Sequence, residues 1–162
     1  LEAYTSKLIE MGVDLKIDSD KIYVPKVEHL TAVHVKTMPY PGFATDLQQP
    51  LTPLMAKAAG VSTVVDTIYP KRVKHIPELQ KMGMKIAADD GKITIEHTDH
   101  FNGADVEAGE IRAGASLVIT GLMADGQTVI HKADNILRGY DRIVWKLNRL
   151  NANVRIEDDE QD

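Results

Sequence analysis

Apolar residues along the chain switch from helical spacing to strand spacing in the same way at three places. Each copy has two apolar residues three positions apart, then a Gly or Asn, then apolar residues at every second position. The copies are Leu8, Met11 and Gly12, then Leu79, Met82 and Gly83, then Leu147, Leu150 and Asn151. Because Gly and Asn tolerate left-handed backbone geometry, each copy predicts the end of a helix and the start of a strand.

Two of these predicted strands continue into hairpins. Residues 19–20 form the expected turn before a strand over 21–24. Residues 90–91, an Asp-Gly pair, form the expected turn before a strand over 92–96. The third predicted strand runs into the acidic segment 157–162, which we expect to be solvated.

A longer parallel precedes the second and third copies, because each has an apolar helical stretch, a Gly turn and a strand. The helical stretches cover 47–59 and 111–125, the turns are Gly60 and Gly126, and the strands cover 61–67 and 127–132. Superposing the two glycines gives an offset of 126 − 60 = 66 residues. The same offset carries Asp46 onto Arg112 and Arg72 onto Arg138, so chemically active residues occupy equivalent places.

These elements predict an α/β (α+β) fold of repeated βαβαββ units, two nearly complete copies plus the end of a third. All of 1–162 is expected to be part of one domain. Units arranged around a pseudo-threefold axis would place equivalent residues on one rim. The first unit ends within 1–30, the second covers 31–98, the third covers 99–158, and a tail covers 159–162.

Composition narrows the classes of function. A chain of 162 residues with 43% hydrophobic content can bury a core. Its formal net charge of -5 argues against binding nucleic acid over a broad surface. No apolar run approaches the roughly 18 residues of a membrane span, so we expect a soluble protein with no membrane partner. The opening residues have the spacing of a helix interior, which predicts that the natural protein extends further toward its amino terminus.

The segment 41–46 is predicted to be a strand-ending turn that opens a helix, where outward-pointing amides favour anions. The alternative is that Thr45 or Asp46 only caps the helix. His97 and His100 are too few to predict a metal site, and we assign no metal. The glycines form no dinucleotide fingerprint after a strand.

Three arginines occupy positions where helix dipoles favour acids. Arg112 lies beside Glu110 in the first turn of a predicted helix, and Arg72 and Arg138 precede other helical stretches. Such conflicts with local rules often mark function. The alternative is that each arginine lies over a sheet edge and pairs with an acid. Because a guanidinium binds carboxylate or phosphate oxygens in pairs, three matched arginines favour a small phosphorylated acid as ligand.

Four ordered segments resemble the UDP-N-acetylglucosamine 1-carboxyvinyltransferases, or enolpyruvyl transferases. They are Pro-Gly-Phe-Ala-Thr-Asp-Leu-Gln at 41–48, Thr-Ile-Tyr-Pro-Lys-Arg at 67–72 with His75, Glu-Ile-Arg-Ala-Gly-Ala at 110–115, and Arg-Gly-Tyr-Asp at 138–141. The resemblance covers essentially the whole chain and implies about the last two-fifths of such an enzyme. The chain departs from the family pattern at Ala44, Pro70-Lys71, Glu110-Ile111 and 135–137. These departures affect the hydrogen bonds that support the site more than the class of reaction.

The resemblance implies a two-domain enzyme that binds its substrates in the cleft between the domains. That enzyme transfers enolpyruvate from phosphoenolpyruvate to the 3-hydroxyl of UDP-N-acetylglucosamine, the first committed step of peptidoglycan synthesis in the cytoplasm. It implies no cofactor, and it makes the missing N-terminal part of the enzyme the partner of this chain. The family's catalytic cysteine and an essential lysine belong to the other domain, so we expect the isolated chain to be inactive.

The resemblance also assigns roles to particular residues. Asp46 would contact the sugar hydroxyl and is the candidate to accept its proton. Ile68 would contact UDP-N-acetylglucosamine through its backbone. Arg112 and Arg138 would hold phosphoenolpyruvate, with Arg72 on the same rim and Glu110 ordering an arginine.

Three other functions stay open from the sequence. One is the related 3-phosphoshikimate 1-carboxyvinyltransferase, which shares the fold and phosphoenolpyruvate. Another is an RNA-binding module with similar repeats, although the acidic balance and few aromatic residues disfavour stacking on bases. The last is a structural or regulatory domain without catalysis.

Overall fold

The computed structural model describes residues 1–158 and confirms a mixed α/β fold; the expected tail 159–162 lies outside the described residues. The helices are α1 (Glu2–Glu10), α2 (Gln48–Lys57), α3 (Ile76–Lys81), α4 (Ile111–Met123), α5 (Asp134–Gly139) and α6 (Ile143–Arg149), with a 3-10 turn η1 (Thr45–Leu47). The strands are β1 (Lys16–Ile17), β2 (Ile22–Tyr23), β3 (His34–Lys36), β4 (Val61–Val65), β5 (Ile86–Asp89), β6 (Lys92–Glu96), β7 (Phe101–Asn102), β8 (Asp105–Glu107), β9 (Ala124–Asp125) and β10 (Val129–His131).

The largest sheet has four strands in the order β3-β4-β6-β5. Strand β3 pairs with β4 in parallel through the crossover helix α2, while β6 pairs antiparallel with both β4 and β5. The β5–β6 hairpin turns at Asp90 and Gly91, both with positive φ, as the Asp-Gly turn predicts. The chain order through this sheet is strand, helix, strand, helix, strand, strand, the order expected for one unit.

The following segment repeats the first half of this arrangement. Strands β7 and β8 pair in parallel with β9 and β10, and α4 is the crossover helix. Gly103 separates β7 from β8 where the backbone of Gln127 approaches so closely that a Cβ would overlap it. The two segments therefore share a β-α-β crossover, which supports their proposed relationship as repeated units.

The predicted strand that starts at Ala152 is wrong. Residues 152–158 have no partner strand among residues 1–158. Instead, the side chain of Asn148 accepts a hydrogen bond from the Val154 amide (2.9 Å) and donates one to its carbonyl (2.8 Å). Alternating apolar residues predicted the extended backbone of this segment but could not supply a neighbouring strand.

The three predicted helix ends are confirmed in backbone detail. Gly12, Gly83 and Asn151 all have positive φ. In each copy the next amide bonds the carbonyl five residues earlier, as in Val13 to Leu8 (3.0 Å), and the same pattern recurs from Met84 to Leu79 and from Ala152 to Leu147. This is the Schellman arrangement, which satisfies the last free carbonyls of a helix.

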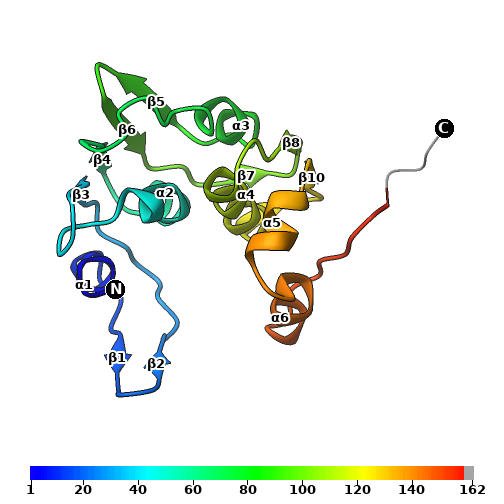
Figure 1. The fold of residues 1–162 in the computed structure, drawn as a ribbon, viewed down its shortest axis with the longest axis horizontal. Helices are drawn as coiled ribbons and strands as arrows, with labels where there is room; N and C mark the ends of the chain where they lie inside the picture. The colour runs from blue at the N-terminus through cyan, green and yellow to red at the C-terminus, as the bar shows by residue number, and fades with distance from the viewer. Residues whose placement is uncertain (159–162) are drawn as a thin grey trace.

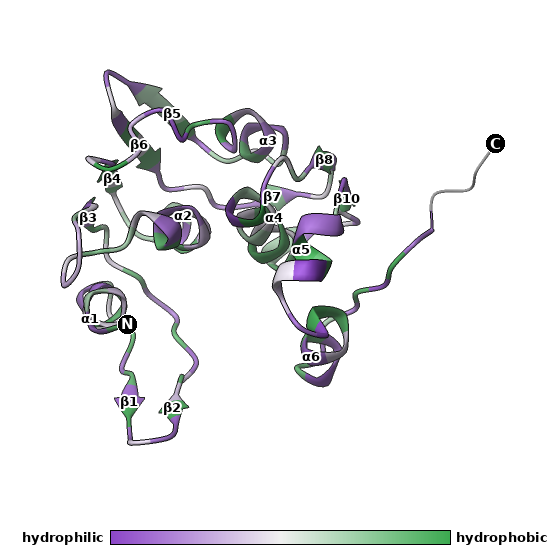
Figure 2. Cartoon of the chain, viewed as in Figure 1, coloured by the Kyte–Doolittle hydropathy of each residue, from purple (hydrophilic) through white to green (hydrophobic). Residues whose placement is uncertain are grey.

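Helices α2 and α4 lie side by side near the middle of the molecule, with the four-stranded sheet beyond α2 (Figure 1). Leu51 and Met55 of α2 and Leu117 of α4 are fully buried. At the other end, α6 carries hydrophobic residues but buries none of its side chains fully (Figure 2). Among residues 1–158, no helix has the length and apolar character needed to cross a bilayer.

His75 is an unusual member of this core. It directly precedes α3, its exposed fraction is 1%, and neither ring nitrogen has a hydrogen-bond partner within residues 1–158. Burial lowers the pKa of His75 from 6.5 to about 4, although the nearby negative charge of Glu110 opposes this change. The imidazole is therefore neutral in the folded protein at pH 7.

The buried His75 should make stability fall on acidification. The unfolded chain binds a proton here near pH 6.5, but the folded chain does so only near pH 4. The stabilising contribution is therefore present above pH 6.5 and is lost as the pH falls toward 4, by about 3 kcal/mol in the free energy of unfolding. Denaturant unfolding of His75→Phe should show a flatter pH dependence over this range, while the exposed His29→Gln should behave like the wild type. An unchanged slope in His75→Phe would contradict this assignment.

Candidate functional site

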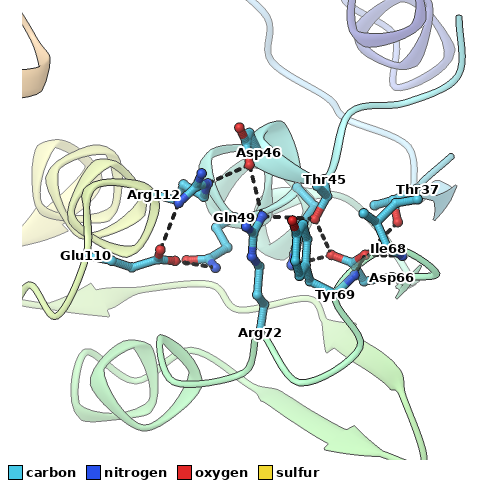
Figure 3. Close-up of polar contacts among 11 residues, drawn as sticks. Thr37, Thr45, Asp46, Gln49, Asp66, Ile68, Tyr69, Arg72, Glu110 and Arg112 are labelled. Atoms are coloured by element: carbon cyan, nitrogen blue, oxygen red, sulfur yellow. Dashed lines mark hydrogen bonds and ion pairs between the residues drawn. The ribbon is translucent and has the colours of Figure 1, made fainter. Parts of the chain in front are cut away.

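One carboxylate oxygen joins two guanidinium groups from different parts of the chain. Oδ1 of Asp46, in η1, accepts hydrogen bonds from Nη1 of Arg72 (2.9 Å) and Nε of Arg112 (2.6 Å), as Figure 3 shows. Arg72 comes from the loop before α3, and Arg112 from the first turn of α4. The structure thus brings together three of the predicted site residues. We call this arrangement of Asp46, Arg72 and Arg112 the carboxylate fork.

The fork is partly open to solvent. The side chain of Asp46 is 59% exposed, while those of Arg72 and Arg112 are 20% and 26% exposed. The hydrogen bond from Arg112 has the largest effect on the pKa of Asp46 and lowers it; burial opposes this change, but the hydrogen bond from Arg72 and the charges of both arginines keep the pKa low. The same hydrogen bond, which Arg112 donates to Asp46, raises the pKa of Arg112, with a further contribution from Glu110. Both partners are therefore held in their charged forms.

Glu110 contacts Arg112 on the side away from Asp46. Its Oε2 accepts a hydrogen bond from Nη1 of Arg112 (2.9 Å), and its Oε1 accepts one from Nε2 of Gln49 (3.0 Å). Glu110 directly precedes α4 with an extended backbone but makes no side-chain capping bond. Its carboxylate therefore holds the arginine rather than the free amides of the helix.

A buried carboxylate that the sequence analysis missed lies at the other end of this network. Asp66 follows β4, and its exposed fraction is 4%. Its oxygens accept hydrogen bonds from the hydroxyls of Thr37 (2.7 Å) and Thr45 (2.6 Å), and from the amides of Ile68 (2.9 Å) and Tyr69 (2.8 Å). Burial alone would raise the pKa of Asp66, but these four bonds outweigh it and lower that pKa.

Thr45 connects Asp66 to the carboxylate fork. Its hydroxyl donates to Asp66 and accepts a hydrogen bond from Nη1 of Arg72 (3.2 Å). No side-chain capping bond forms at the start of η1 or α2, so the interpretation of Thr45 or Asp46 as a simple helix cap is wrong. A continuous set of polar contacts therefore runs from Asp66 through the fork to Gln49.

The loop after β4 presents the predicted residue Ile68 beside the fork. Asp66 bonds the amide of Ile68, whereas the carbonyl of Ile68 accepts no hydrogen bond from residues 1–158. Next to it, the ring of Tyr69 lies under the guanidinium of Arg72, with 3.8 Å between the guanidinium carbon and the ring centroid. The loop thus supports Arg72 and leaves the carbonyl of Ile68 without a hydrogen-bond partner among residues 1–158.

Arg138 does not join the fork. It precedes α6, as expected, but it lies in the last turn of α5, where a helix dipole favours a cation, so the expected conflict with a helix dipole is wrong for this residue. Its guanidinium donates to the carbonyl of Asp134 and to Oδ1 of Asn135, both at 3.4 Å. The adjacent Gly139 packs against Ile111 so closely that a Cβ would overlap it, which brings the end of α5 to the start of α4. Arg138 is therefore near Arg112 in the fold without bonding its partners.

Comparison with known sequences places these residues in a family. The profile of EPSP synthase (3-phosphoshikimate 1-carboxyvinyltransferase) matches residues 1–147. UDP-N-acetylglucosamine 1-carboxyvinyltransferase 2 of Lactiplantibacillus plantarum is 57% identical over 161 residues, covering 99% of this chain and 38% of that protein. The UDP-N-acetylglucosamine 1-carboxyvinyltransferase of Lactobacillus johnsonii is 55% identical over 159 residues, covering 98% of this chain and 38% of that protein. The chain thus spans about 38% of the length of these curated relatives.

Solved structures show the same fold. The enolpyruvyl transferase NikO from Streptomyces tendae superposes with a TM-score of 0.87 at 28% identity, covering 96% of this chain and 36% of that one. An EPSP synthase from Acinetobacter baumannii superposes with a TM-score of 0.60 at 16% identity, covering 80% of this chain and 32% of that one. The second likeness concerns the fold alone.

Removing the charge of Asp66 should destabilise the chain. In Asp66→Asn, an amide group faces donors that now bond a carboxylate, so we expect the free energy of unfolding to fall by about 2–4 kcal/mol. Denaturant unfolding at pH 7 measures this change. The exposed Asp14→Asn removes the same charge and should shift stability by less than about 0.5 kcal/mol. Equal effects of the two variants would show that Asp66 has no special structural role.

Proposed function

This chain belongs to the EPSP synthase family, and we propose that it forms one wall of the active-site cleft of a UDP-N-acetylglucosamine 1-carboxyvinyltransferase. The rest of that protein would supply the opposite wall. The two relatives described above carry this name and match nearly the whole chain. The proposed reaction is a committed step of peptidoglycan synthesis and takes place in the cytoplasm.

The observation that carries this proposal is the convergence of two guanidinium groups on one exposed point. Arg72 and Arg112 come from different segments, yet both donate to a single oxygen of Asp46. Carboxylate and phosphate oxygens are the partners that arginine binds best. Phosphoenolpyruvate carries both groups, so the exposed face of the fork suits its recognition. Arg138, at the nearby end of α5, would add a third cation after a rotation of its side chain.

Asp46 is the proposed acceptor of the proton from the sugar 3-hydroxyl. As that O–H bond breaks, its electron pair forms the bond from oxygen to C2 of phosphoenolpyruvate, and C3 takes a proton from an acid outside this chain. Loss of phosphate from the tetrahedral ketal then returns a proton from C3 and restores the double bond. The carbonyl of Ile68 would accept a hydrogen bond from the sugar nucleotide. In this arrangement Arg112 stabilises negative charge that develops on the phosphoenolpyruvate portion.

The choice of UDP-N-acetylglucosamine as the substrate that receives enolpyruvate rests on the relatives. The two carboxyvinyltransferases described above, at 57% and 55% identity, are named for UDP-N-acetylglucosamine, whereas the EPSP synthase structure is 16% identical. This difference favours the sugar nucleotide over 3-phosphoshikimate. The formal net charge of -5 also disfavours the alternative of an RNA-binding module.

Asp46→Asn should abolish most of the activity of the full-length protein that contains this chain. An amide cannot accept the hydroxyl proton, so we expect kcat to fall roughly 10²- to 10⁴-fold. Phosphate release measures turnover. The exposed Asp89→Asn removes the same charge from a strand of the four-stranded sheet and should retain wild-type turnover. Unchanged turnover in Asp46→Asn would remove Asp46 from the chemistry.

UDP-N-acetylglucosamine should perturb the isolated chain at the proposed sugar contacts. In amide NMR spectra we expect shifts at Asp46 and Ile68, with weak affinity because only one wall is present. An RNA oligomer at the same ionic strength should leave these resonances in place. Shifts caused by RNA but not by the sugar nucleotide would contradict the proposed function.

A further inference from the structure

The proposed role of Asp46 conflicts with its state in the free chain. A general base works best when its pKa lies near the working pH. Here hydrogen bonds and charge from Arg112 and Arg72 lower the pKa of Asp46, which makes its carboxylate a weaker base. The two arginines that should bind a substrate anion are also already bonded to this carboxylate. Both difficulties concern the same pair of contacts.

The geometry of the fork offers one solution to both. Only Oδ1 of Asp46 bonds the arginines; Oδ2 makes no hydrogen bond within residues 1–158 and points away from both guanidiniums in Figure 3. Asp46 also has the most exposed side chain of the three. Because the Asp46 side of these ion pairs is open to solvent, another anion can replace its carboxylate at small cost.

Arg72 and Arg112, in contrast, have further hydrogen-bond and stacking partners besides Asp46. Arg112 is bonded by Glu110, which is itself bonded by Gln49. Arg72 is bonded to Thr45 and stacked on Tyr69. These contacts do not involve Asp46, so both guanidiniums can keep their places when its carboxylate leaves.

We propose that the carboxylate of Asp46 occupies the place of a substrate anion in the free protein, and that anion binding displaces it and so activates it as a base. This inference rests on the proposed function and deepens it. Phosphate or carboxylate oxygens of phosphoenolpyruvate take over the donors of Arg72 and Arg112. Asp46 then turns toward the sugar hydroxyl without its two cationic partners. The base becomes competent only when the substrate anion is in place, which couples proton removal to productive binding.

The charged groups around Asp46 make this exchange specific. Arg72 from the loop before α3 and Arg112 from α4 are its direct partners. Glu110 lies behind Arg112, and Asp66 lies behind Thr45, so neither competes for the exposed side of the fork. When a bound anion takes the place of the Asp46 carboxylate, positive and negative groups therefore still alternate along this network.

Titration of the chain with inorganic phosphate, at constant ionic strength, tests the proposal. We expect the guanidinium resonances of Arg72 and Arg112 to shift, and the pKa of Asp46, followed by carboxyl carbon NMR, to rise toward its ordinary value. A crystal structure with phosphate should show Asp46 Oδ1 no longer bonded to Nε of Arg112. Phosphate bound with the Asp46 contacts intact and its pKa unchanged would overturn this inference alone. Phosphate that perturbs neither arginine would overturn the proposed anion wall as well.

Two isosteric variants separate displacement from a simple effect of charge. Asp46→Asn removes the competing carboxylate, so it should bind phosphate roughly 2- to 10-fold more tightly, even though it should be inactive in the full-length protein. Glu110→Gln removes the same charge from the same arginine, but it also weakens the support of Arg112. Its phosphate affinity should therefore equal or fall below that of the wild type. Equal tightening in both variants would contradict the displacement of Asp46.

Discussion

The packing of α2 against α4 is the contact on which the site depends. Both helices bury apolar side chains, with Leu51 and Met55 on one and Leu117 on the other. Because the two helices belong to related crossovers, their amino-terminal ends reach the same region, where Asp46 meets Arg112. Gly114 in the second turn of α4 adds to this arrangement, since a Cβ there would crowd Ile136 of α5. The hydrophobic core thus determines which charged residues can meet.

The sequence predicted those parts of the fold that depend on local backbone chemistry. Left-handed helix ends at Gly12 and Gly83 and the Asp-Gly hairpin turn need only a residue that tolerates positive φ, and all are present. The predicted strand at 152 failed for a different reason. Exposure still alternates over 152–155, as the apolar pattern required, but a strand also needs a partner backbone. Periodicity reports which face of a segment is apolar and says nothing about whether a neighbour is available.

The site was predictable where charge and repetition gave a signal. The offset of 66 residues related Asp46 to Arg112, and the structure joins these residues by a hydrogen bond. It related Arg72 to Arg138 as well, but α5 ends at Gly139 and holds Arg138 apart from the fork. The sequence did not predict Asp66 as part of the network because its partners are hydroxyls and backbone amides, which produce no pattern of opposite charges in the sequence. The only local signal was an Asp directly after an apolar strand, in position to bond amides two and three residues later.

The conflict at Arg112 explains why the network alternates in charge. A cation in the first turn of a helix is disfavoured by the helix dipole by some tenths of a kcal/mol, so Arg112 gains from carboxylates on both sides. Glu110 meets this need from a position fixed by Gln49, and Asp46 meets it from a solvent-exposed position. One neutralising carboxylate is therefore fixed and the other exchangeable. A site that neutralised Arg112 with two fixed carboxylates would have no vacancy for a substrate anion, whereas a site with none would leave the arginine poorly placed before the substrate arrives.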